Sequence, residues 1–204
     1  MRKMMRRAAT VGVFALGFAT STTWAQETAR VRGTIARADG QTLVVKSREG
    51  TELKVVLTNN ALVAGLAKAS LSDIKPGSFV GVSGIPQPDG IQKAIEVHIF
   101  PDSMRGFGEG HRPWDLQPQS TMTNASVEQT VTGVDGQMLT LKYKDGEKKV
   151  VVSSDTQIVT FTPGDKSDLK PGVKIFIAAA DKQPDGTLLA ARVYFGKDGL
   201  TPPL

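Results

Sequence analysis

The sequence predicts an all-β protein, with two tandem five-stranded OB-like β-barrels as the expected architecture. Short runs of alternating apolar and polar residues are separated by Asp-Gly and Pro-Gly turn signals. Long stretches of helical periodicity are absent, which favours the all-β class. The chain is also internally repeated. Motifs recur at an offset of 95 or 96 residues: DGQ at 39–41 and 135–137, SD(I/L)KPG at 72–77 and 167–172, and QPDG at 87–90 and 183–186.

Residues 1–25 have the pattern of a cleaved export signal. Four basic residues precede an apolar run at 11–19, which is too short to span a bilayer, and the stretch ends on Ala25. We expect cleavage before Gln26 and delivery to the periplasm by the general secretion route. The mature protein should then keep no membrane anchor.

The first copy, residues 26–100, contains five candidate strands, at 31–36, 42–46, 53–57, 79–84 and 94–100. The second copy, residues 127–196, repeats them at 127–133, 138–143, 148–152, 173–179 and 188–195, and a short tail follows at 197–204. Residues 60–70 favour a short helix or turn after the third strand, and the equivalent residues 156–166 favour a loop. A five-stranded unit hides its edges best by closing into a barrel. One merged β-sandwich is the alternative.

The repeated motifs serve the fold, because Asp-Gly and Pro-Gly supply the backbone angles of tight turns. On these motifs (a V-x-G-x-[IV] opening with DG, then L-x-x-[LI]-K-P-G, then Q-x-DG before the last strand) the chain resembles a bacterial exported family. That family is classed as a domain of unknown function with an OB-like β-barrel fold. The match covers residues 31–97 and, more loosely, 131–193. The resemblance implies a fold and an extracytoplasmic location, and supplies no catalytic residues.

Composition excludes several functions. The chain holds 25 basic and 20 acidic residues, and the export signal carries four of the basic ones, which leaves 21 against 20. A nearly neutral protein gives no electrostatic argument for nucleic-acid binding. Cysteine is absent, so disulfides, thiol catalysis and lipid attachment through cysteine are excluded.

The crossover at residues 101–126 has no counterpart in the other copy, so function is best sought there. It is broken by glycine and proline and still carries Phe107, Arg112 and Trp114, the last being the only tryptophan after the export signal. Large aromatic side chains are unusual in a plain linker. We therefore expect this segment to pack onto a barrel. Trp114 either fills a barrel end or the interface between the copies, or contacts a ligand or partner together with Phe107 and Arg112.

Both histidines lie near this crossover. His98 shares the outward face of its strand with Glu96, and the second copy has Arg192 and Tyr194 at these positions. His98 and His111 with a carboxylate, Glu96 or Glu109, would suit zinc. The addition of Met104 would suit copper. Two surface histidines without a metal are the simpler interpretation.

The sequence thus predicts a non-enzymatic binding or scaffold protein of the cell envelope, whose partner is an unknown envelope protein or ligand. A copper- or zinc-binding protein using His98 and His111 is the alternative. An enzyme is not expected. The chain has no Gly-x-Ser-x-Gly elbow and no phosphate-binding lysine loop, and its glycine-rich stretch 106–110 lacks dinucleotide-fingerprint spacing.

Overall fold

The structure is a computed structural model that describes residues 27–133 and 136–204. The predicted export signal, with its expected cleavage before Gln26, lies outside the described residues. The all-β class is confirmed, because the described residues hold twelve strands, four single-turn 3₁₀ helices and no α-helix. No helix among them is long and apolar enough to cross a membrane. The strands are β1 (Thr28–Asp39), β2 (Thr42–Ser47), β3 (Glu52–Lys68), β4 (Phe79–Pro86), β5 (Gln92–Ile99), β6 (Gly110–Pro113), β7 (Thr121–Gly133), β8 (Gly136–Tyr143), β9 (Gly146–Val152), β10 (Gln157–Pro163), β11 (Lys174–Lys182) and β12 (Leu188–Gly196).

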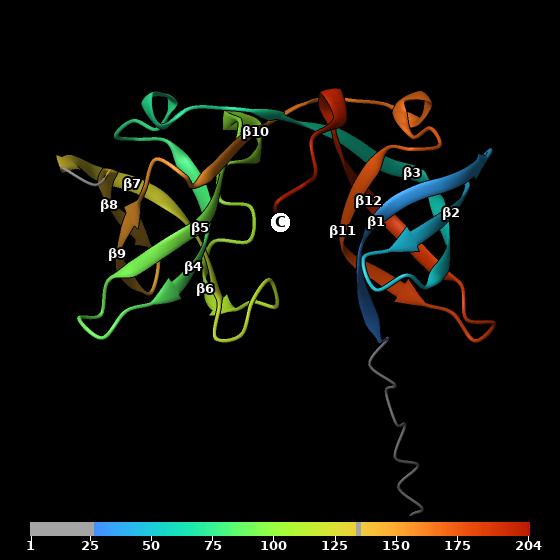
Figure 1. Ribbon diagram of the computed structural model, residues 1–204, viewed down its shortest axis with the longest axis horizontal. Helices are drawn as coiled ribbons and strands as arrows, with labels where there is room; N and C mark the ends of the chain where they lie inside the picture. Colours follow the sequence, from blue (N-terminus) through green and yellow to red (C-terminus); the bar gives the residue numbers. More distant parts are fainter. Residues whose placement is uncertain (1–26, 134–135) are drawn as a thin grey trace, which may run out of the picture.

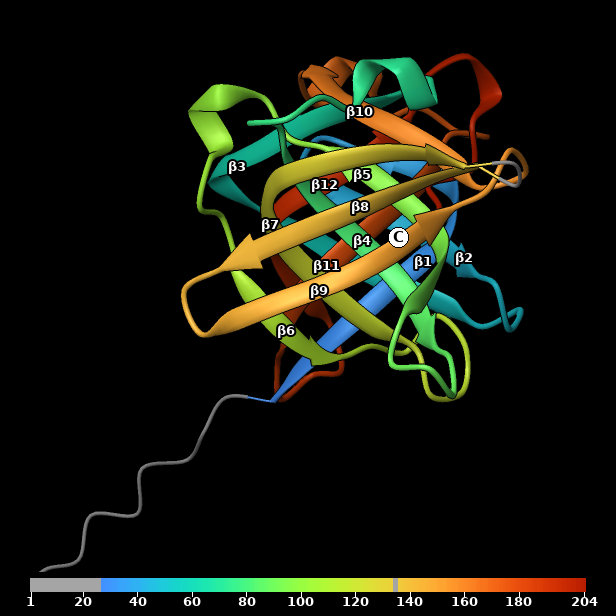
Figure 2. The same ribbon diagram turned by 90° about the vertical axis from the view of Figure 1, so that its left-hand side faces the viewer.

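The strands close into two rings that lie side by side (Figure 1). In the first ring, β1, β2, β3, β12 and β11 are joined by hydrogen-bonded ladders, with β12 parallel to β3. In the second ring, β4, β5, β9, β8 and β7 are joined in the same way, and a short parallel contact between β5 and β9 closes it. Figure 2 faces this second ring, where β7, β8 and β9 curve around β4 and β5.

Each ring has an apolar interior of its own. The first is filled by side chains such as Val31, Val45 and Ile177, and the second by Val82, Leu139 and Val150, all with essentially no exposed surface. These residues come from the alternating positions that the sequence pattern assigns to a core. Burial of a Val, Leu or Ile side chain contributes about 1.5–3 kcal/mol, so two such interiors supply most of the driving force for folding.

Each ring combines strands of both copies. The first ring takes β1, β2 and β3 from the first copy and β11 and β12 from the second; the second ring takes β4 and β5 from the first copy and β7, β8 and β9 from the second. The rings therefore do not follow the expected domain boundaries at residues 26–100 and 127–196. Residues 69–78 carry the chain out of the first ring, and residues 164–173 carry it back.

Two expectations for the connecting segments were wrong. Residues 60–68 continue β3 instead of forming a helix, and residues 157–163 form strand β10 instead of a loop. The reason is tertiary pairing: this half of β3 bonds to β12 on one edge and to β10 on the other, which overrides the helix propensity of its alanines. The only helical turns nearby are η1 (Leu71–Asp73) and its equivalent η3 (Lys166–Asp168).

The crossover is more regular than its glycines and prolines predict. It contains a 3₁₀ turn, η2 (Asp102–Met104), the short strand β6, and the first residues of β7, which begins at Thr121 rather than near residue 127. Strand β6 pairs with the edge of β7 that faces away from β4. Gly106, Gly108 and Gly110 all have positive φ and make the tight path between η2 and β6. The segment packs back onto the protein, as expected.

The candidate site is the cleft between the two rings

A row of aromatic side chains crosses from one ring to the other. Phe100, directly after β5, stacks on Phe161 of β10 with ring centroids 5.2 Å apart, and Phe161 meets Tyr194 of β12 at 5.3 Å. Tyr194 stacks on Phe176 of β11 at 6.3 Å, and Phe176 meets the edge of Trp114 at 6.4 Å. Such pairs add about 0.5–1.5 kcal/mol each beyond their buried area. The row therefore holds the two rings together and lines the cleft between them.

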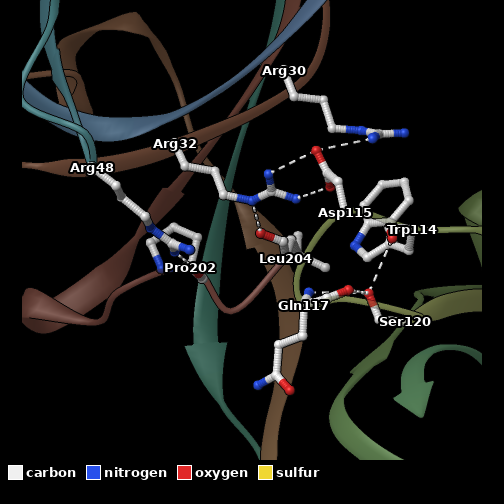
Figure 3. A network of polar contacts seen from close by, with 9 residues as sticks. All are labelled: Arg30, Arg32, Arg48, Trp114, Asp115, Gln117, Ser120, Pro202 and Leu204. Carbon is white, nitrogen blue, oxygen red and sulfur yellow. Dashed lines mark hydrogen bonds and ion pairs between the residues drawn. The ribbon is translucent and has the colours of Figure 1, made fainter.

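Trp114 lies at the mouth of the cleft, under arginines of the first ring (Figure 3). The Arg30 guanidinium carbon is 4.0 Å from the centre of the Trp114 ring, a cation–π contact. The next residue, Asp115, forms ion pairs with Arg30 at 3.1 Å and with Arg32 at 2.7 Å. Hydrogen bonds from Arg32, reinforced by Arg30 and opposed by partial burial, lower the pKa of Asp115 to about 2. The crossover is thus fastened to the first ring by charge as well as by packing.

The loop after Trp114 is held by its own hydrogen bonds. The Trp114 amide donates to the carbonyl of Ser120, and the Ser120 hydroxyl donates to the carbonyls of Trp114 and Gln117. Ser120 is buried. These bonds close the loop that leads into β7 of the second ring, so Trp114 is held by that loop as well as by the arginines of the first ring.

His98 and Glu96 point into the interface between the rings instead of into solvent. The sequence placed them on the outward face of their strand, which is correct for the second ring taken alone. The first ring and the crossover cover that face, and the exposed fractions are only 4% for His98 and 1% for Glu96. His98 Nδ1 lies 3.3 Å from both carboxylate oxygens of Glu96. Burial raises the pKa of Glu96, and the neighbouring His98 opposes that shift.

Gly81 makes room for the His98 ring. It is paired with His98 across β4 and β5, and a Cβ atom built on Gly81 would lie 1.9 Å from His98 Nε2 and 2.8 Å from Asn124 Oδ1. No side chain larger than hydrogen fits there while the imidazole keeps its place. The ring also contacts Phe100 and Phe161 edge-on, which joins it to the aromatic row.

Buried polar atoms without partners collect on this side of the cleft. Asn124 is 3% exposed, and its Oδ1 has no hydrogen-bond partner in the structure; the same holds for Trp114 Nε1 and for Ser83 Oγ on β4. Leaving such an atom unpaired costs about 1–3 kcal/mol. Both Asn124 and Trp114 also line the same small cavity.

Two cavities make up the cleft, and both are lined by Ala178. The inner cavity has a volume of about 60 Å³ and is mainly aromatic; it is lined by His98, Phe100, Phe107, Arg112, Trp114, Met122, Asn124, Phe161, Phe176, Ala178, Tyr194 and Leu204. The outer cavity is open and polar, with a volume of about 670 Å³; it is lined by Thr28, Arg30, Arg32, Ser47, Glu49, Thr51, Leu53, Asp115 and Ala178. The cleft thus offers an apolar pocket next to a wider polar groove.

The three residues predicted to contact a ligand or partner come together in this cleft. Phe107, Arg112 and Trp114 all line the inner cavity. Phe107 is 38% exposed, with the Arg192 guanidinium 4.8 Å from its ring centre. Arg112 donates to the carbonyl of Gly108, and burial together with the nearby Arg30 lowers its pKa.

The expected metal site is not assembled. Register places His98 in line with Gly81 on the cleft side of the sheet, whereas His111 pairs with Thr123, in line with Val82, on the opposite side. His111 Nδ1 instead lies 2.8 Å from the Thr123 hydroxyl, and its ring stacks near Tyr143. Burial, followed by Lys148 and Arg112, lowers the pKa of His111.

The remaining proposed ligands lie elsewhere. Glu109 accepts a hydrogen bond from the Lys144 amide, and Met104 belongs to the half-exposed turn η2. Across residues 27–133 and 136–204, no group of three or more His, Asp or Glu side chains is arranged to hold a metal ion. The structure therefore does not bring His98, His111, Glu96, Glu109 and Met104 together in one centre, and a copper or zinc site stays a prediction.

Sequence reasoning missed the residues that the first ring and strand β10 contribute. Arg30, Arg32, Phe161, Phe176 and Tyr194 were not predicted as site residues, although all five line the cleft. One signal was present: Tyr194 replaces His98, and the two positions were recognised as outward-facing equivalents. The missing information was that these two outward faces meet.

Comparison with known proteins finds one family model that matches part of the chain, and its description names no function. Residues 32–98 match the model of a domain of unknown function, DUF5666, which confirms the resemblance to a family of that kind. The match spans β1 to β5 and therefore strands of both rings. No curated protein and no solved structure matches the chain.

Proposed function

We propose that this chain is a non-enzymatic binding protein and that its ligand is held in the cleft between the two rings. One observation carries the proposal: the crossover, which only one of the two copies possesses, returns to the cleft and completes it with Phe107, Arg112 and Trp114. Segments that a fold does not need for its own barrels, yet that carry aromatic and arginine side chains to a concave surface, are typical of binding sites.

The chemistry of the cleft supports binding rather than catalysis. Aromatic rings and arginines dominate it, and both are enriched at recognition surfaces. His98 and Glu96 are close, but the pair is buried below the inner cavity, and a nucleophile next to it would have to be Ser83. The Ser83 hydroxyl makes no hydrogen bond with either residue, so a nucleophile–base–carboxylate relay is not formed.

A fragment screen tests the proposal. We would titrate the ¹⁵N-labelled protein with a set of small aromatic, amide and carboxylate fragments and record amide chemical-shift changes. Hits should concentrate on residues around Trp114, Phe176 and Tyr194 and disappear in a Trp114→Ala/Tyr194→Ala variant. A Tyr143→Ala variant, which removes an aromatic ring outside the cleft, is the matched control and should keep the hits. Hits that are absent, or that scatter over both rings, would refute a cleft ligand.

We also propose that the protein acts in the periplasm after export. The support is the basic, apolar and small-residue pattern of residues 1–25. N-terminal sequencing of protein recovered from the periplasmic fraction should begin at Gln26. Recovery from the cytoplasm with residue 1 intact would refute export.

A further inference from the structure

The last five described residues, 200–204, lie between the two rings (Figure 1). Their sequence is Leu-Thr-Pro-Pro-Leu, and burial alternates along them: Leu200, Pro202 and Leu204 are buried, Thr201 is exposed and Pro203 is intermediate. Leu204 is 3% exposed and packs in the same cluster as Phe176 and Tyr194. It also lines the inner cavity. The Leu204 side chain thus lies in the cleft, whereas Pro202 lines a separate hollow on the first ring with Arg48 and Lys174.

Side chains, rather than a β-ladder, hold this segment. Arg48 donates to the carbonyl oxygen of Pro202 at 3.0 Å, and Arg32 donates through Nε to the main-chain oxygen of Leu204 (Figure 3). Gln157 donates to the carbonyl of Thr201 at 3.4 Å, and the Lys174 ammonium donates to the Thr201 hydroxyl at 2.9 Å. These donors come from β1, the turn after β2, β10 and β11. Within the described chain, no main-chain hydrogen bond joins residues 201–204 to another main-chain group.

The contact pattern matches the recognition of a proline-containing peptide. Pro202 and Pro203 have no N–H, so the segment presents acceptors to the cleft, and arginine side chains only donate. Aromatic grooves that take extended proline-rich segments exploit the low conformational entropy of such peptides. Here the groove is formed by Phe176, Tyr194 and Leu66, and Leu204 fills its apolar end.

The segment can leave without breaking either ring. It joins β12 only through the turn η4 (Lys197–Gly199), in which Asp198 has φ of 50° and Gly199 has φ of 77°. Asp and Gly are among the residues that adopt this left-handed conformation most readily, and they make a tight turn here. The groove also continues past Leu204, because Arg32, which binds the Leu204 oxygen, borders the open outer cavity. A longer peptide would therefore find further contacts at Arg30.

We propose that the cleft is a docking groove for an extended, proline-containing peptide segment of another protein, and that residues 200–204 occupy it as an internal substitute. This inference rests on the proposed binding function and adds the class of its partner. A partner peptide would place an apolar side chain in the aromatic pocket and its carbonyl groups on Arg32 and Arg48. It would displace the internal segment as it binds.

The test uses the full chain and a variant that ends at Gly199, both with Trp24→Phe so that Trp114 is the only tryptophan. The probe is the synthetic peptide Leu-Thr-Pro-Pro-Leu-Glu-Glu, and the control peptide carries Asp in place of the second Leu. Binding is followed by Trp114 fluorescence and by calorimetry. The shortened chain should bind the probe and not the control peptide.

The full chain should bind the same probe more weakly. A segment on a short linker acts at an effective concentration of about 1 mM, so a peptide with a Kd of about 50 µM should bind the full chain about 20-fold more weakly. Arg48→Ala in the shortened chain removes a carbonyl contact and should weaken binding about tenfold. Arg37→Ala, an exposed arginine on β1 for which the structure gives no contact with the segment, is the matched control and should change nothing.

Each outcome decides between the alternatives. A folded shortened chain that ignores the probe overturns the proposal; if fragments still bind near Trp114, the cleft remains a binding site for another ligand class. If the shortened chain does not fold, the full chain with Leu204→Asp is used, and failure of that variant to fold as well shows that the segment belongs to the core and overturns the proposal. A concentration-dependent dimer of the full chain that disappears on shortening would assign the groove to a second copy instead.

Discussion

Replacement of Gly81 by alanine gives the sharpest test of how the cleft is packed. The new methyl carbon would lie 1.9 Å from His98 Nε2 and 2.2 Å from His98 Cε1. Normal contact between such atoms is about 3.5 Å, so the imidazole or the strand must move by roughly 1.5 Å. Overpacking of this kind costs about 1–3 kcal/mol. We expect Gly81→Ala to lower the free energy of unfolding by that amount.

A matched control separates this clash from the general effect of removing a glycine. At Gly84, on the same strand, a methyl would meet the Lys93 carbonyl oxygen at 3.1 Å and Gln92 Oε1 at 3.2 Å, which small shifts can relieve. Gly→Ala also restricts the unfolded chain, which stabilises by about 0.4–1 kcal/mol where the backbone permits it. Gly84→Ala should therefore lie within about 1 kcal/mol of wild type in urea unfolding followed by circular dichroism.

A double variant then identifies the cause. In a His98→Ala background the methyl on Gly81 enters the space that the imidazole leaves, so the cost of Gly81→Ala should fall to less than half. Such coupling between contacting residues is commonly 0.5–3 kcal/mol. If Gly81→Ala costs no more than Gly84→Ala, or if its cost is unchanged without His98, then the packing of the cleft described above is incorrect.

Three further predictions concern charge and connectivity. Asp115→Asn should lower the free energy of unfolding by at most about 1 kcal/mol at pH 7, because the carboxylate is 45% exposed and solvent screens its ion pairs. Wild type should keep this stability advantage above the ordinary pKa of 3.8 and lose it as pH falls towards 2, which urea unfolding at several pH values measures. Burial raises the pKa of Glu96, so the favourable contribution of its protonated form to stability is present below the ordinary pKa of 4.5 and is lost as pH rises through the raised pKa. At pH 7, Glu96→Gln should therefore be at least as stable as wild type, and its stability advantage over wild type should shrink on acidification. A stability advantage of the variant that grows on acidification would contradict this. Fragments 1–100 and 101–204 should each be unable to form the two rings alone and should form a stable one-to-one complex when co-expressed, whereas two independently folded fragments that do not associate would refute the exchange of strands.

The strands were predictable because their signals are local. Asp-Gly and Pro-Gly turns and apolar alternation placed all ten ring strands close to their observed positions. The second half of β3 was not predictable as a strand, because its alanines and leucines have helix propensity and only pairing with β12 and β10 makes it a strand. Strand β12 lies more than a hundred residues from β3 along the sequence, so no local sequence pattern can predict that the two strands pair.

The exchange of strands between the copies could not be predicted from the sequence either, for a different reason. The two copies carry equivalent interior residues, such as Val82 in β4 and Ile177 in β11, so either strand satisfies the apolar pattern of either ring. Alternation predicts which face of a strand is inside, and it does not predict which ring the strand joins. Trp114 was identified because it lies in unrepeated sequence, whereas Tyr194 and Phe176 looked like ordinary members of a repeated strand.

The exchange also explains why the two copies differ on one face and agree on the other. Positions that face the ring interiors are apolar in both copies, whereas the cleft-facing positions have diverged: Gly81 and His98 in the second ring correspond to Phe176 and Tyr194 in the first. His98, Phe176 and Tyr194 line the same inner cavity, Phe161 of β10 lies between His98 and Tyr194, and Gly81 leaves the space that the His98 imidazole fills. If the two copies were identical at these positions, the cleft would contain either two Phe and two Tyr side chains that overlap, or a gap that nothing fills. The cleft, and any ligand it takes, therefore depends on a covalent duplication whose halves have become complementary, so a symmetric dimer of either half should not reproduce the site.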